Sequence, residues 1–139
     1  KVLHRFTIIK NTNYRNSMGS NPLNLLIRFL LELTALIALG FWGWRNGEGA
    51  FRYALAIIIP VIIAAVWGTF AVPDDPSRSG SAPIAVAGYL RLAIELTVFC
   101  LAIWALYDTK FVKSSWIMGA VVAVHYMVSY DRIMWLINQ

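Results

Sequence analysis

Four long apolar runs, separated by short polar segments, dominate the hydrophobic pattern of this chain. They predict membrane-spanning helices near residues 22–44, 51–72, 86–107 and 115–137. Each run is close to the roughly 20 residues that a helix needs to cross the hydrocarbon core of a bilayer. Helices of a soluble bundle carry a continuous polar face, whereas only isolated polar residues interrupt these runs. The pattern therefore predicts an all-α, polytopic membrane protein, built as a four-helix transmembrane bundle.

The ends of the runs carry signals that are typical of helix boundaries. Asn21 can cap the first helix, and Pro22 suits its first turn. Pro60, in the middle of the second run, is tolerated in a membrane helix and predicts a kink. Pro73 ends that run and opens residues 73–83, a stretch rich in proline, serine and aspartate that predicts a loop.

The chain also contains an internal repeat. A shift of 63 residues aligns RFLLELT at residues 28–34 with RLAIELT at residues 91–97, without a gap. The same shift places Phe41 on Trp104 and Trp44 on Tyr107. Each unit holds two spans, so both copies would face the same way. The pattern predicts two parallel two-helix repeats, related by an axis along the membrane normal.

The amino-acid composition is typical of a protein whose outer surface faces lipid. Charged residues make up 14% of the chain and hydrophobic residues 59%, against about 25% charged residues in a soluble domain. The formal net charge is +5, but the basic residues lie mostly at the ends of apolar runs, which indicates the membrane surface and argues against nucleic acid as a partner. The single cysteine, Cys100, excludes an internal disulfide, and its apolar surroundings predict a packed thiol.

Ionisable residues inside the apolar runs are the candidate functional groups, because a charge inside a membrane is costly and often functional. Each repeat places an arginine four residues before a glutamate, Arg28 before Glu32 and Arg91 before Glu95. From the expected boundary on the side of the N-terminus, Glu32, Glu95 and His125 would all lie about 12 Å deep. The sequence allows arginine–glutamate pairing within each helix and pairing between the first and third helices.

The fourth run adds further polar groups to this layer. His125, Ser129 and Arg132 follow the spacing i, i+4, i+7, which places them on one face of a helix. The candidate intramembrane polar site therefore consists of Arg28, Glu32, Arg91, Glu95, His125, Ser129 and Tyr130.

Three interpretations of this layer compete. In the first, a polar cavity binds a small solute or relays protons, and His125 changes its charge near neutral pH if a glutamate lacks its arginine. In the second, the charges only hold helices together, in a structural or assembly subunit of a membrane complex or in a homo-oligomer. A metal site from Glu32, Glu95 and His125 is disfavoured, because no E-x-x-H pair accompanies them. We therefore predict no cofactor. No nucleophile-elbow sequence surrounds Ser129, so an enzyme is also disfavoured and no catalytic residue is assigned.

A second candidate site lies at the membrane interface. Its members come from the loop and from the end of the fourth run, and they are Asp74, Asp75, Arg78, Asp131 and Arg132. Carboxylates beside an arginine could bind a lipid headgroup or an ion. A solvated loop, capped by its own aspartate and serine side chains, is the alternative.

Several strings, among them WGTFAVPDDPSRSG and HYMVSYDRIMWL, resemble those of the YrdB-like family of small bacterial four-span membrane proteins. The resemblance covers residue 21 to the end of the chain. It implies a protein of the bacterial inner membrane with no established activity, and it assigns no catalytic residue. It also implies a polar signature formed by Asn21, Arg28, Glu32, Asp74, Asp75, Arg78, Arg91, Glu95, His125, Tyr130, Asp131 and Arg132.

The first 20 residues and the charge distribution predict how the chain is oriented. Residues 1–20 form a basic, polar segment, which we interpret as a disordered tail or as a stretch upstream of a start at Met18. Residues 21–139 then form a single domain. Lysine and arginine number eight on the side of the N-terminus and four on the other side, which predicts cytoplasmic termini. With a start at Met18 the count is four on each side.

Overall fold

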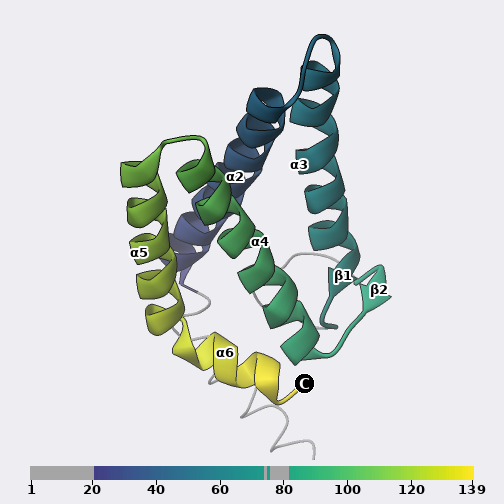
Figure 1. Cartoon of the computed structure of the whole chain (residues 1–139). Helices are drawn as coiled ribbons and strands as arrows, with labels where there is room; N and C mark the ends of the chain where they lie inside the picture. The colour runs from purple at the N-terminus through teal and green to yellow at the C-terminus, as the bar shows by residue number, and fades with distance from the viewer. Residues whose placement is uncertain (1–20, 74, 76–81) are drawn as a thin grey trace, which may run out of the picture.

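A computed structural model of the chain describes residues 21–73, 75 and 82–139. The described residues form five helices and one short sheet (Figure 1). In chain order, the elements are α2 (Pro22–Asn46), α3 (Phe51–Thr69), β1 (Phe70–Ala71), β2 (Ile84–Ala85), α4 (Gly88–Asp108), α5 (Val112–Val128) and α6 (Tyr130–Ile137). Strands β1 and β2 pair in parallel, with Phe70 opposite Ile84 and Ala71 opposite Ala85. The all-helical class predicted from the sequence is confirmed.

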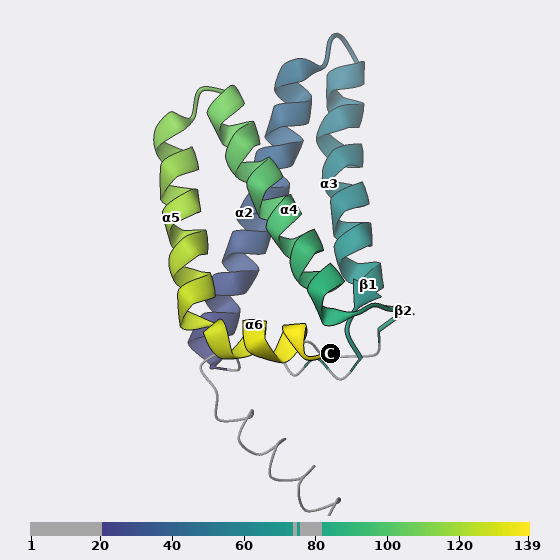
Figure 2. The same ribbon diagram turned by 60° about the horizontal axis from the view of Figure 1, so that its bottom comes forward.

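The long helices form two antiparallel hairpins, α2 with α3 and α4 with α5 (Figures 1 and 2). Helix α2 also packs against α4, so the two hairpins share one core. Helix α6 lies across the end of the bundle where α2 and α4 begin (Figure 2). The chain thereby places a short helix beneath the first turns of α4, next to the polar residues described below.

The helix boundaries follow the local sequence. The side chain of Asn21 accepts a hydrogen bond from the backbone N–H of Leu23, at 2.9 Å, and Pro22 occupies the first turn of α2, as predicted. Helix α3 is continuous through Pro60 and ends at Thr69. The turn between α2 and α3 includes Gly49, whose φ of 52° lies in the left-handed region that glycine adopts without strain.

Two glycines bring α2 and α3 together. A Cβ atom on Gly40 would lie 2.9 Å from the carbonyl oxygen of Ala56, and one on Gly43 would lie 2.9 Å from that of Leu55. Both distances are too short for a real side chain, so the backbones can approach this closely only with glycine. Small residues at helix contacts are a common device for packing helices when no hydrophobic driving force operates between them.

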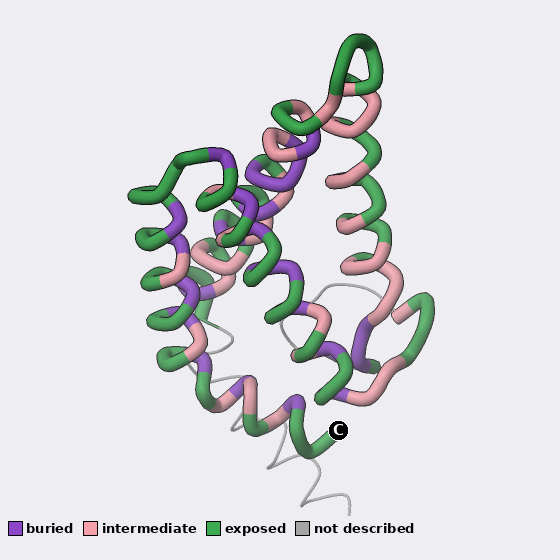
Figure 3. The backbone as a smooth tube through the Cα atoms, viewed as in Figure 1, coloured by how far each residue is buried: buried purple, intermediate pink, exposed green. Residues whose placement is uncertain are grey.

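The core lies between α2, α4 and α5, whereas α3 contributes no buried residue (Figure 3). Four alanines that are almost fully buried allow the helices to approach closely, and larger side chains fill the space beside them. The buried core consists of Leu31, Ala35, Ala38, Leu39, Val98, Phe99, Ala102, Ala105, Met118 and Val122. The outward faces of the same helices carry large apolar side chains, such as Ile37, Ile57 and Ile117.

The structure corrects three sequence predictions. The fourth run is not one helix over 115–137, because α5 ends at Val128 and α6 begins at Tyr130. Ser129 interrupts it with φ −92° and ψ 26°, and its hydroxyl accepts a hydrogen bond from the Asn24 amide at 2.7 Å. The second run is not helical to residue 72, because α3 ends at Thr69 and Phe70–Ala71 form β1, which pairs with β2 on the other side of the predicted loop at 73–83; no alternating pattern indicated these strands. Cys100 is exposed rather than packed, because it lies on the outward face of α4.

Candidate functional site

Both arginine–glutamate motifs form ion pairs within their own helices. On α2, Arg28 Nε donates to Glu32 Oε1 at 2.9 Å, and on α4, Arg91 Nε donates to Glu95 Oε1 at 3.0 Å. The i, i+4 spacing brings these side chains together on one helix face. Pairing within the helices, which the sequence left open, is therefore present in both motifs.

Glu95 also binds arginines from two other helices. Arg28 Nη2 lies 2.9 Å from Glu95 Oε1, which joins α2 to α4. Arg132 of α6 makes a bidentate contact with Glu95, in which Nη1 donates to Oε2 at 3.0 Å and Nη2 donates to Oε1 at 2.9 Å. The Tyr126 hydroxyl of α5 donates to Oε2 at 3.2 Å. With its side chain only 2% exposed, Glu95 is the hub at which α2, α4, α5 and α6 meet.

The same cluster reaches the end of α3 and the loop that follows. Arg91 Nη1 donates hydrogen bonds to the backbone carbonyl oxygens of Trp67 and Phe70. These contacts involve the backbone, so no side-chain pattern in the sequence indicates them. Arg132 Nη2 lies 3.4 Å from Asp75 Oδ2. Burial alone would lower the pKa of Arg132, but the carboxylates of Glu95 and Asp75 outweigh it and hold that pKa above its ordinary value.

The charges of the cluster balance. Three guanidinium groups, from Arg28, Arg91 and Arg132, face three carboxylates, from Glu32, Glu95 and Asp75. A buried charge is tolerated when it is paired and hydrogen-bonded, and removal of one partner leaves the others uncompensated. We call these six residues the charge cluster.

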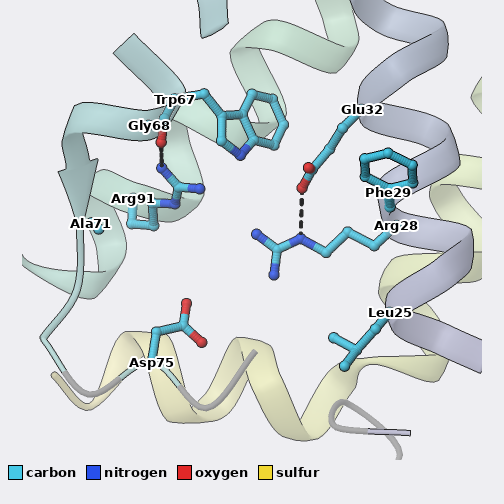
Figure 4. A pocket seen from close by; sticks show the side chains of 9 residues that line it. All are labelled: Leu25, Arg28, Phe29, Glu32, Trp67, Gly68, Ala71, Asp75 and Arg91. Atoms are coloured by element: carbon cyan, nitrogen blue, oxygen red, sulfur yellow. Dashed lines mark hydrogen bonds and ion pairs between the residues drawn. The ribbon is translucent and has the colours of Figure 1, made fainter. Parts of the chain in front are cut away.

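A cavity of about 280 Å³ lies beside the charge cluster, between α2, α4 and the end of α3. Figure 4 shows Arg28, Glu32 and Asp75 pointing into this space, with Trp67 above them. The Glu32 side chain is 28% exposed, against 2% for Glu95. The lining residues are Leu25, Arg28, Phe29, Glu32, Trp67, Gly68, Ala71, Asp75 and Arg91. We call this space the charged cavity.

Sequence comparisons identify the family to which this architecture belongs. A family model described as "Protein of unknown function (DUF2568)" matches residues 26–123. The chain belongs to this family. It is 46% identical over 119 residues to the uncharacterized protein YrdB of Bacillus subtilis (strain 168), and the match covers 86% of this chain and 97% of that protein. No solved structure matches the chain. The YrdB-like resemblance is confirmed, and it supplies no activity.

In this member of the DUF2568 family, the two candidate sites merge into one. Arg132, a member of the predicted interfacial site, binds Glu95 beside Arg28 and Arg91, and Asp75 of the same predicted site binds Arg132. Asp131 instead accepts a hydrogen bond from the backbone N–H of Arg132, at 2.8 Å, as expected for a residue in the first turn of α6. Asp74 and Arg78 lie outside the described residues.

Tyr130, a member of the predicted intramembrane site, does not join the charge cluster. Its side chain is 62% exposed, because the break at Ser129 turns it away from the bundle. Tyr126 takes that place beside Glu95. Ser129 is buried and accepts a hydrogen bond from Asn24, which was not among the predicted site residues. The sequence does contain a feature that could have identified Asn24, because it is a polar residue one helical turn before Arg28.

His125 is buried, but it does not pair with a carboxylate. Its ring lies edge-on to the Tyr126 ring, with centroids 5.6 Å apart, and among the described residues its Nδ1 atom has no hydrogen-bond partner. A switch at His125 required a glutamate without an arginine, and both Glu32 and Glu95 have one. Within residues 21–73, 75 and 82–139, no group of three histidine, cysteine or acidic residues lies close enough to hold a metal ion.

Proposed function

We propose that this chain is an integral protein of the bacterial cytoplasmic membrane, with α2, α3, α4 and α5 crossing the bilayer. In the described part of the chain, α2, α3 and α4 are long and apolar enough for a span. Helix α5 has 17 residues, or about 26 Å, which is short for a bilayer core of about 30 Å. Large apolar side chains face outward on all four helices, where a soluble protein would carry polar groups.

In this arrangement, α6 lies at the membrane interface and both termini are cytoplasmic. Its placement across the end of the bundle keeps the C-terminus on the side where α2 begins. The excess of basic residues on that side supports the orientation. The two hairpins follow each other along the chain at the offset of the sequence repeat, which supports a parallel repeat. A reporter fused after Gln139 would be active in the cytoplasm, and activity only outside it would contradict this topology.

The function that the geometry supports best is the binding of a small polar solute in the charged cavity, near one leaflet. One observation carries this proposal: a cavity of about 280 Å³ that both positive and negative side chains line, at the end of apolar helices. Ionisable groups at membrane depth that face a cavity commonly mark the path or the binding site of a solute.

The charges of the charged cavity indicate which solute would fit. Glu95 is enclosed by three arginines and is out of reach of a solute. Glu32 and Asp75 line the space, opposite Arg28 and Arg91. A zwitterionic solute could present its anionic group to the arginines and its cationic group to Glu32, and it would leave the net charge of the cavity unchanged. In the alternative form of this proposal, Glu32 carries a proton instead of binding the cationic group of a solute.

A structural or assembly role is the second candidate, and the Glu95 hub favours it. One carboxylate there joins four helices, which accounts for buried charges without any solute. The two candidates differ at Glu32. A purely structural cluster would lose only stability in Glu32→Gln, and nothing that depends on solute or pH.

Calorimetry in nanodiscs can test solute binding with three related probes. At pH 5, below the second phosphate pKa of about 6, phosphoethanolamine carries one positive and about one negative charge, inorganic phosphate carries the anion alone, and ethanolamine carries the cation alone. We expect phosphoethanolamine to bind at least tenfold more tightly than either fragment, and Glu32→Gln to abolish that preference. Glu48→Gln, an exposed glutamate at the other end of the bundle, is the matched control. Equal or absent binding of all three probes would reject the zwitterion site.

A further inference from the structure

Two N–H donors in the lining of the charged cavity have no hydrogen-bond partner among the described residues. Arg91, whose side chain is only 4% exposed, donates from Nε to Glu95 and from Nη1 to two backbone carbonyls, which leaves Nη2 without a partner. The Trp67 ring contacts the Phe99 ring and the Arg91 guanidinium, which leaves the indole Nε1 without a partner. Figure 4 shows both side chains beside the space that Glu32 faces from α2.

Both atoms are accessible from the cavity. Among the described residues, the only fully buried side-chain nitrogen or oxygen without a partner is His125 Nδ1, and His125 does not line this cavity. Arg91 Nη2 and Trp67 Nε1 are therefore unpaired without being enclosed by protein. Polar atoms of nearly buried side chains are normally hydrogen-bonded, so these two donors are open to a ligand. Together they suit an anionic group that offers two oxygens.

Glu32 offers a matching acceptor across the cavity. Its Oε1 atom accepts a hydrogen bond from Arg28, whereas its Oε2 atom has no hydrogen-bond partner among the described residues. The Glu32 side chain is 28% exposed, so Oε2 can be reached. A primary ammonium group donates hydrogen bonds and carries the opposite charge, so it suits this carboxylate. The two walls of the cavity are thus complementary to the two ends of a zwitterion.

In the topology proposed above, the charged cavity lies at the level of the lipid headgroups. Arg91 is three residues from the first residue of α4, and Trp67 is two residues from the last residue of α3. At 1.5 Å per residue, both lie within about 5 Å of a helix end. The headgroup layers extend a bilayer from a hydrocarbon core of about 30 Å to about 40–45 Å. Basic pockets between membrane helices at this level are a recurrent kind of lipid headgroup site.

The cavity also opens toward the side of the bundle. Helices α2 and α3 pack closely at Gly40 and Gly43 and diverge toward the cavity (Figures 1 and 2). Two lining residues mark the opening: Phe29 on α2 is 57% exposed, and nothing described lies within 4 Å of a Cβ position on Gly68 of α3. In the proposed topology these residues face lipid, so acyl chains can leave between the two helices while a headgroup stays inside.

From these observations, we propose that the solute of the charged cavity is the headgroup of a membrane phospholipid, phosphatidylethanolamine. The phosphodiester binds Arg91 Nη2 and Trp67 Nε1 through its two free oxygens, and the ammonium binds Glu32. The balanced charge cluster favours a diester, because a phosphodiester with an ammonium is neutral, whereas a phosphomonoester carries about −1.5 to −2 at pH 7. The inference rests on the proposed function and deepens it, since it names the lipid that supplies the zwitterion.

The indole signal of Trp67 can report this binding directly. Protein labelled with 15N-tryptophan is placed in phosphatidylcholine nanodiscs that contain increasing fractions of phosphatidylethanolamine. Trp67→Phe identifies the Trp67 signal among those of the six tryptophans. We expect a saturable shift of this signal. Phosphatidylglycerol, which keeps the phosphodiester but lacks the ammonium, should bind at least tenfold more weakly; Glu32→Gln should abolish this preference, and Glu48→Gln should retain it.

Glycerophosphoethanolamine, the same headgroup without acyl chains, separates a lipid ligand from a free solute. It should shift the Trp67 signal in discs of phosphatidylcholine alone, but not in discs rich in phosphatidylethanolamine, because the lipid already fills the site. A shift with glycerophosphoethanolamine in both kinds of disc, and none with phosphatidylethanolamine, would overturn the lipid proposal and leave the proposed function standing. The absence of a shift with either ligand would also overturn it, and the calorimetry described above then decides whether the proposed function survives.

A conservative substitution tests the Trp67 donor itself. Trp67→Phe keeps an aromatic ring in the cavity wall but removes Nε1, and we expect it to weaken glycerophosphoethanolamine binding at least tenfold in calorimetry. Trp116→Phe is the matched control, because Trp116 is 73% exposed on α5 and does not line the cavity. Equal binding by the two variants would contradict the proposal.

Discussion

The two arginine–glutamate motifs are locally alike and globally different. Arg28–Glu32 and Arg91–Glu95 have the same spacing and nearly equal Nε–Oε1 distances, 2.9 and 3.0 Å. The Glu32 side chain is nevertheless 28% exposed beside the charged cavity, whereas the Glu95 side chain is 2% exposed and binds three arginines. Identical short motifs thus take different environments, because the surrounding helices differ.

The difference comes from what covers each motif. Helix α6 lies against the beginning of α4 and delivers Arg132 to Glu95. In the first hairpin, α3 packs closely on α2 through Gly40 and Gly43, at the far end from Glu32, and the space near Glu32 stays open as the charged cavity. One glutamate therefore joins four helices, and the other lines the charged cavity, where we propose that a solute binds. Four substitutions test this comparison.

The largest effect is expected for Glu95→Gln. The change removes the carboxylate that compensates Arg28, Arg91 and Arg132, and breaking a buried ion pair costs about 3–5 kcal/mol. Unfolding by sodium dodecyl sulfate in mixed micelles, followed by circular dichroism, measures this loss. Glu48→Gln is the control, since Glu48 is exposed. A loss no greater than that of Glu32→Gln would remove the distinction between the two motifs.

Gly88→Ala tests whether α6 packs tightly against α4. A Cβ on Gly88 would collide with the carbonyl oxygen of Leu136, a backbone atom that cannot move without α6. Overpacking of this kind costs about 1–3 kcal/mol, and we also expect faster proteolysis of the C-terminal segment. Gly68→Ala is the matched control, because nothing described lies within 4 Å of its Cβ position. Equal stability of the two variants would show that α6 does not dock on Gly88.

Glu32→Gln should cost much less than Glu95→Gln. It removes one hydrogen-bonded ion pair whose carboxylate is partly exposed, and Arg28 keeps Glu95 as a partner. We expect a loss of about 1 kcal/mol in the same unfolding experiment. A loss as large as that of Glu95→Gln would mean that Glu32 also holds the fold together, and it would weaken the case for a solute site.

The smallest effect is expected for Tyr126→Phe. The hydroxyl donates one hydrogen bond to Glu95, at 3.2 Å, and that carboxylate keeps its three arginines. Hydrogen bonds between membrane helices average about 0.6 kcal/mol, which is the loss we expect. Tyr130→Phe is the control, because Tyr130 is exposed. If the two variants were equally stable, the Tyr126 hydroxyl would contribute nothing measurable to the hub.

The sequence by itself determined the local features of this protein. The apolar runs predicted the long helices α2, α3 and α4, Asn21 and Pro22 marked where α2 begins, and the i, i+4 spacing placed each arginine within reach of the glutamate on its own helix. These features depend on residues close together in the chain, so short-range periodicity and capping rules are sufficient to find them.

Only the tertiary structure decided which glutamate became the hub. At the break between α5 and α6, Ser129 accepts a hydrogen bond from Asn24, which lies 105 residues earlier in the chain. Beyond this break, Arg132 reaches Glu95 and Tyr130 faces outward. Arg91 also donates to the backbone carbonyls of Trp67 and Phe70, and a carbonyl is present at every residue, so the sequence carries no mark of that contact. Charge compensation in a buried site depends on distances between separate helices, and those distances exist only once the helices have packed.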